Sequence, residues 1–129
     1  MRIIFCDIET ERLIRPEKIW VCVTKEPRQQ PRVWKNLHLK ENQDAFHSYL
    51  DSGDYCFVGH NFLGFDLPVL VAHTGISQSA RVIDTLVCSR LFDSFNHRTH
   101  SLDDWGERLG YPKIKFKDFS KLTPEMITY

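Results

Sequence analysis

The chain has 129 residues, 42% of them hydrophobic and 26% charged, which is ordinary for one globular domain with a single sizeable core. Lysine plus arginine and aspartate plus glutamate number 17 each, so net charge gives no argument for a nucleic-acid partner. The sequence shows neither a signal peptide nor an apolar run near the ~20 residues of a membrane helix, so we expect a cytoplasmic protein with no membrane partner.

Hydrophobic patterning predicts three strands in residues 1–37. Ile3 to Ile8 is a short apolar run, which predicts a strand buried on both faces. Residues 18–24 and 32–37 predict two further strands, separated by a turn that two prolines bracket. We therefore expect these strands to form an antiparallel meander.

Helices and strands alternate in the rest of the chain. Strands are predicted at 55–61 and 81–85, and helices at 42–53, 66–75, 86–94 and 100–110. The fourth of these helices opens with Ser101-x-x-Asp104, a capping-box pattern, and stops at Gly110. An irregular basic loop over 111–121 then precedes a last helix that begins near Thr123. This order of elements predicts an α/β fold with a mixed sheet.

The cysteines are single and widely spaced, which fits neither a zinc site nor a disulfide framework. They are Cys6, Cys22, Cys56 and Cys88. Because they lie in or near apolar stretches, we expect buried, reduced thiols.

Two acids, Asp7 and Glu9, end the first predicted strand in the stretch FCDIET. Side chains two residues apart on a strand share a face, so these carboxylates lie close together and repel each other. A divalent cation between them reverses the sign of that interaction, and carboxylate oxygens suit Mg²⁺ or Mn²⁺. The alternative is a strand end that emerges into solvent.

A third acid follows another predicted strand, in the stretch VGHNFLGFDLPVL. Asp66 stands at the start of a predicted helix, where the alternative role is helix capping, and Asn61 is equally suited to a turn. Functional groups of α/β sheets gather at the carboxyl ends of strands. Three acids that converge on one edge would suit two-metal phosphodiester chemistry.

The stretches FCDIET and HNFLGFDLPVL resemble the first two motifs of proofreading 3′–5′ exonucleases of the DEDD superfamily, tyrosine subtype. With VIDTLVCSRL and SLDDWGERLGYPK, the resemblance extends over nearly the whole chain. More narrowly, the sequence resembles the exonuclease domain of family A DNA polymerases from podovirus-type phages. It implies an RNase H-like α/β fold for residues 1–129, with a mixed five-stranded sheet and flanking helices, in the cytoplasm of a phage-infected bacterial cell.

The resemblance also implies roles for individual residues. It makes Asp7, Glu9 and Asp66 ligands of two Mg²⁺ or Mn²⁺ ions, and Tyr129 the residue that positions the attacking water. The terminal nucleotide of the single strand would be contacted by Thr10, Leu13, Asn61 and Phe65. Two further polar residues are expected to be structural: Asp84 as a helix cap, and His100.

The third motif of this group is Tyr-x-x-x-Asp, and only its tyrosine has a counterpart, Tyr129 in the final EMITY. The alternative is that Tyr129 is an ordinary helix residue. We expect residues 1–129 to be an exonuclease domain that lacks part of its last helix and its fourth acid. A polymerase domain, in the same or a separate chain, could then supply that acid.

The expected function is metal-dependent hydrolysis of 3′-terminal nucleotides of single-stranded DNA, as in proofreading during phage DNA replication. One alternative is a catalytically weak or inactive fragment that binds single-stranded nucleic acid or docks on a polymerase, and another is a 3′–5′ exoribonuclease. The lysines of the basic loop, Lys113, Lys115 and Lys117, alternate with Ile114 and Phe116. They could follow a phosphate backbone, or belong to a solvated edge strand whose apolar side packs inward.

Overall fold

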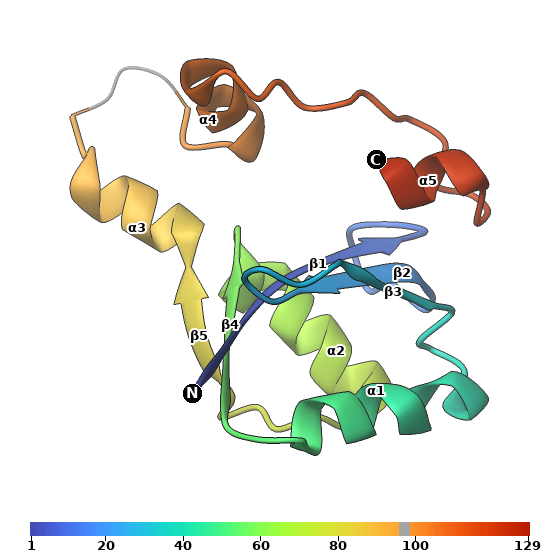
Figure 1. Ribbon diagram of the computed structural model, residues 1–129. Coiled ribbons are helices and arrows are strands. Elements are labelled where there is room, and N and C mark those ends of the chain that lie inside the picture. Colours follow the sequence, from blue (N-terminus) through green and yellow to red (C-terminus); the bar gives the residue numbers. More distant parts are fainter. Residues whose placement is uncertain (96–98) are drawn as a thin grey trace.

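The computed structural model describes residues 1–95 and 99–129, and in this part of the chain five strands form one sheet in the order β3-β2-β1-β4-β5 (Figure 1). The strands are β1 (Arg2–Thr10), β2 (Ile19–Lys25), β3 (Arg32–Lys35), β4 (Tyr55–Gly59) and β5 (Arg81–Asp84). β1, β2 and β3 pair antiparallel, whereas β4 pairs parallel with both β1 and β5. The predicted mixed five-stranded sheet and its opening meander are therefore confirmed.

Helical segments follow β3, β4 and β5, and two further helices lie in the C-terminal part of the chain. They are η1 (Lys40–Asn42), α1 (Gln43–Asp51), the π-helical turn η2 (Phe62–Asp66), α2 (Leu67–Thr74), α3 (Thr85–Phe92), α4 (Leu102–Leu109) and α5 (Pro124–Thr128). None of the helices in the described ranges is long and apolar enough to cross a membrane.

The main core lies between the sheet and the helices α1 and α2. Phe46 and Leu50 of α1 and Leu70 of α2 are buried against Ile4 and Phe57 of the sheet. Side chains of α1 also donate to the end of α2, as where Gln43 Nε2 donates to the His73 carbonyl at 2.8 Å. Figure 1 shows the two helices together below the sheet.

The prediction that the first strand is buried on both faces is wrong. In β1 the side chains of Ile4, Cys6 and Ile8 are buried, whereas Phe5 is 46% exposed and Asp7 is also exposed. Since α1 and α2 pack on one face, alternation sends the odd-numbered residues to the other. Asp7 and Glu9 consequently lie on the face opposite the main core.

Local sequence signals fix several helix ends. Ser101 Oγ accepts a hydrogen bond from Asp104 N at 3.1 Å, and Gly75 and Gly110 end α2 and α4 with φ of +73° and +79°. Such left-handed backbone favours glycine because it has no Cβ. These caps confirm the predicted helix limits.

Two predictions about side-chain environment need correction. Cys6, Cys22 and Cys56 are buried free thiols as expected, but Cys88 is exposed because Ser89 rather than Cys88 occupies the buried side of α3. The basic loop also forms no strand, so the alternative of a solvated edge strand is wrong. Its residues run between α4 and α5 as an irregular segment (Figure 1).

Candidate active site

Three carboxylates from two distant segments meet beyond the carboxyl end of the β1–β4 pair. Asp66 Oδ2 accepts a hydrogen bond from Ile8 N at 3.1 Å, so it is tied to the backbone between Asp7 and Glu9. The parallel pairing of β1 with β4 ends at Phe5, opposite Val58, which leaves the Ile8 N–H free on that side. Asp66 uses this donor, and its side chain makes no capping bond to α2.

The turn that carries Asp66 is held by a carboxylate from β5. Asp84 Oδ1 accepts from Asn61 N and Leu86 N, and its Oδ2 accepts from Leu63 N, each at 2.9 Å. The bond from Leu86 N is the expected helix cap. The two bonds to the η2 turn were not foreseen, because they join residues more than 20 positions apart.

Backbone geometry of the η2 turn depends on small and flexible residues. Asn61 takes a left-handed conformation with φ of 54°, and Phe65 N donates to its carbonyl at 3.0 Å. A Cβ on Gly64 would lie 2.4 Å from Asn61 Oδ1, and one on Gly59 would lie 2.6 Å from the Phe62 ring. The sequence VGHNFLGFD thus forms a tight turn that delivers Asp66 to β1.

The three carboxylates hold their protons more strongly than ordinary acids. Burial, followed by the charge of Asp7, raises the pKa of Asp66 to about 8 and that of Glu9 to about 7. Burial also raises the pKa of Asp7, although Lys113 and a hydrogen bond with Glu9 act against this. Negative charge is therefore concentrated here beyond what the surroundings neutralise.

The donor set suits a hard divalent cation, since it consists of carboxylate oxygens whose mutual repulsion a cation would remove. Within the described ranges, no group of three or more His, Cys, Asp or Glu side chains has a geometry ready to hold a metal ion. Asp66 is engaged with Ile8 N, and Glu9 is hydrogen-bonded to Asp7. Metal binding would accordingly displace protons and reorient these side chains.

Lys113 interacts both with Tyr129 and with the acids Asp7 and Glu9. Lys113 Nζ is 4.7 Å from the centroid of the Tyr129 ring. Partial burial acts to lower the pKa of Lys113, but a hydrogen bond with Tyr129 and the charges of Glu9 and Asp7 raise it overall. Lys113 is a site residue that the sequence placed only in a basic loop, because nothing local connects it to β1.

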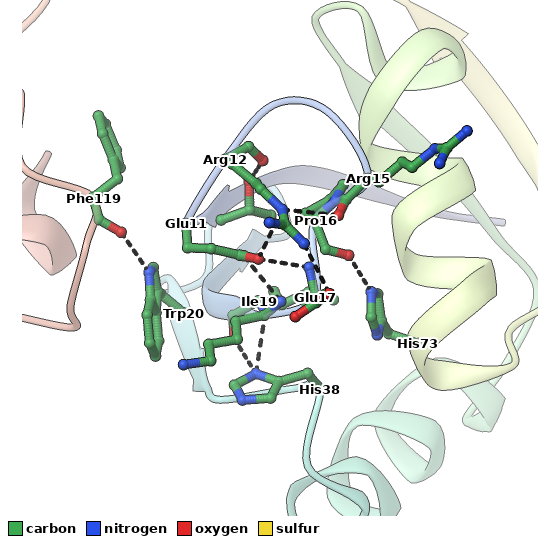
Figure 2. A network of polar contacts seen from close by, with 12 residues as sticks. Glu11, Arg12, Arg15, Pro16, Glu17, Ile19, Trp20, His38, His73 and Phe119 are labelled. Carbon is green, nitrogen blue, oxygen red and sulfur yellow. Dashed lines mark hydrogen bonds and ion pairs between the residues drawn. The ribbon is translucent and has the colours of Figure 1, made fainter.

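Aromatic contacts fix the position of this C-terminal part. The Tyr129 ring packs on Phe116 and Phe119, with centroids 5.6 and 5.8 Å away. Trp20 Nε1 on β2 donates to the Phe119 carbonyl at 2.7 Å, as Figure 2 shows. The segment is thus attached to the sheet near the carboxylates.

The four residues expected to contact a nucleotide differ in accessibility. Thr10 is buried, and its hydroxyl donates to the Arg12 carbonyl at 2.7 Å. Phe65 is half-buried against the main core. Leu13, at 80% exposure, and Asn61 present free surface. The side chains of Leu13 and Asn61 are therefore open to a ligand, Phe65 is partly open, and Thr10 is not.

The loop that carries Leu13 is internally bonded. Glu11 accepts from Glu17 N at 2.7 Å and from Lys18 N at 2.9 Å, and Arg12 pairs with Glu17 at 2.9 Å (Figure 2). The Pro16 carbonyl lies 2.8 Å from His73 Nε2 on α2. Leu13 therefore projects from a fixed loop.

The sheet order, the helices and the acids at the strand ends define an RNase H-like exonuclease fold, as the resemblance implied. No protein-family model and no curated protein matches the chain. Solved structures do match, including a nuclease in its apo form, with a TM-score of 0.79 and 23% identity over 98% of this chain and 63% of that one.

Two further solved structures have known ligands. Brucella melitensis NrnC with bound Mg²⁺ has a TM-score of 0.75 and 21% identity, over 98% of this chain and 63% of its own. The metal-free E. coli ExoI–ssDNA complex has a TM-score of 0.51 and 14% identity, over 70% of this chain and 30% of its own. At these identities the likeness establishes the fold, and this chain spans 63% of the length of the nuclease and of NrnC.

Proposed function

We propose that this chain is a metal-dependent 3′–5′ exonuclease domain that hydrolyses terminal nucleotides of single-stranded DNA. The observation that carries the proposal is the convergence of Asp7, Glu9 and Asp66: Asp66 Oδ2 accepts from Ile8 N at 3.1 Å, and the charge of Asp7 raises the pKa of both Glu9 and Asp66. Such a group is unfavourable for an apo fold and favourable for cation binding. Bound Mg²⁺ in NrnC and bound single-stranded DNA in ExoI support it.

Each residue of the site has a definite task in this proposal. Asp7, Glu9 and Asp66 hold the divalent ions, and Asp84 keeps Asp66 in place. Bound ions would supply an activated water and positive charge at the leaving oxygen. Tyr129, held by its aromatic neighbours, positions the water. Leu13, Asn61 and the exposed part of Phe65 receive the terminal nucleotide, whereas the buried Thr10 holds the start of the Leu13 loop through its bond to the Arg12 carbonyl.

We further propose that the domain belongs to the proofreading machinery of a phage family A DNA polymerase. Its basis is the motif resemblance, in which Asp66 follows Asn61 by five positions, as in the phage form.

The test compares wild type with Asp66→Asn and with the control Asp51→Asn, a change at the exposed end of α1. We expect millimolar Mn²⁺ to raise the melting temperature of wild type and of the control but not of Asp66→Asn. Cleavage should require a free single-stranded 3′ end and the same carboxylate. An unchanged wild-type melting temperature with Mn²⁺ would refute the metal site. Faster cleavage of RNA than of DNA of equal sequence would favour the exoribonuclease.

A further inference from the structure

We propose that Tyr111–Lys117, here called the lysine segment, is the docking surface for the phosphate backbone of a single strand on its way to the carboxylates. The inference rests on the proposed function and adds to it the path that the substrate takes. It is carried by three features: fixed ends, lysines beside an anionic site, and exposed apolar side chains next to those lysines.

The lysine segment is anchored at its start by the end of α4. Tyr111 N donates to the Gly106 carbonyl at 2.8 Å, and Gly110 supplies the left-handed residue that the turn requires. A Cβ on Gly106 would lie 2.5 Å from the Tyr111 carbonyl oxygen, so helix and segment are in close contact.

A second anchor holds the far end of the segment. Phe116 packs edge-on against Phe119, with centroids 5.0 Å apart, and against Tyr129. The bond from Trp20 Nε1 to the Phe119 carbonyl joins this cluster to β2. With both ends held, the backbone between them offers a surface of fixed position although it forms neither helix nor strand.

The positive charges of the lysine segment favour an anionic partner. Lys113 Nζ lies 4.7 Å from the centroid of the Tyr129 ring, and Lys113 is near enough to Asp7 and Glu9 for their charges to act on it. Lys115 and Lys117 are exposed, and the ion pairs found among the described residues do not include them. A phosphodiester that approaches three carboxylates is repelled, and neighbouring cations offset that repulsion.

Spacing and side-chain type favour a single strand over a duplex. Alternate residues of an extended segment lie at most about 7 Å apart, a step comparable to that between phosphates of a stretched strand. Tyr111 and Ile114, at 83% and 61% exposure, leave apolar surface before the first lysine and between the first two. Bases of a single strand can stack on an aromatic ring, whereas those of a duplex are occupied with each other.

The test measures anisotropy of a fluorescent single-stranded oligonucleotide with the full chain in EDTA, over a series of KCl concentrations. The variants are Lys113→Gln, Lys115→Gln and Lys117→Gln, with Lys40→Gln on η1 as the matched control. Each segment variant should reduce the slope of log K against log[KCl] by about 0.7 and weaken binding about threefold at low salt. Lys115→Arg should restore the slope, and Tyr111→Ala should weaken binding without changing it.

Unchanged slopes in all three segment variants, or an equal loss in Lys40→Gln, would overturn the inference. So would equal affinity for blunt duplex. The Mn²⁺-dependent shift in melting temperature tests the proposed function independently of these binding measurements. A normal shift with lysine-independent binding refutes the docking surface alone, whereas lysine-dependent binding without any shift refutes the nuclease and retains the surface.

Discussion

Replacement of Asp66 by asparagine should stabilise the metal-free protein. The side chain is 5% exposed, and its pKa is raised from 3.8 to about 8 by burial and by Asp7. Between these two values the folded state binds a proton that the unfolded state has lost, so stability falls as pH rises from about 4 to 8. An asparagine has no charge to bury, and its amide oxygen can still accept from Ile8 N.

The size of the effect follows from the same shift. Roughly four pKa units at ~1.4 kcal/mol each set a ceiling of about 5 kcal/mol at pH 8. Relaxation and nearby water reduce penalties of this kind, so we expect a gain of about 2 kcal/mol, or roughly 6–10 °C in melting temperature.

Urea denaturation in EDTA at pH 5 and pH 8 measures the effect, with Asp51→Asn as control. Asp66→Asn should exceed wild type at pH 8, and the difference should shrink at pH 5. Saturating Mn²⁺ should reverse the order, because only wild type gains linkage free energy, about 2.7 kcal/mol at one hundred times Kd. If the variant were less stable than wild type at pH 8 in EDTA, the hydrogen bond from Ile8 N to the carboxylate would contribute more than burial of the charge costs. The argument from charge would then fail.

Two substitutions and one pH profile give further tests of the site and of the lysine segment. Asp84→Asn should cost about 2–3 kcal/mol in urea denaturation, since one amide oxygen cannot accept from three N–H groups and its NH₂ faces a donor. Gly106→Ala should cost about 1–2 kcal/mol and weaken single-strand binding, because its Cβ would meet the Tyr111 carbonyl at 2.5 Å. Cleavage at limiting Mn²⁺ should rise with pH through 7 to 8, as Glu9 and Asp66 lose the protons that compete with the metal.

Each of these three predictions would be contradicted by a specific result. Wild-type stability in Asp84→Asn would show that the η2 turn does not need the carboxylate. For Gly106→Ala the control is Gly53→Ala, whose Cβ would be at an ordinary 3.6 Å from Arg2 Cδ, and equal losses in both would remove the steric explanation. A flat pH profile of cleavage would mean that protons do not compete at this site.

Features of the fold that depend on neighbours in sequence could be predicted from the sequence. Strand alternation placed Asp7 and Glu9 on one face, because the side-chain period of a strand is fixed. Ser101, Asp84 and Gly110 marked helix ends, because capping bonds join residues two to four positions apart. The mixed sheet followed from the order of these elements.

Contacts between distant segments were decided only by the tertiary structure. From the sequence, Asp66 could have been either a helix cap or an active-site acid. In the structure its side chain makes no capping bond, because β1–β4 pairing ends before Ile8 and leaves the Ile8 N–H free to donate to Asp66. The two bonds from Asp84 to the η2 turn, and the approach of Lys113 to β1, depend on where β5 and the lysine segment pass the sheet. No periodicity records such distances, because they result from the packing of whole elements, and that packing turned three separate acids into one coupled group.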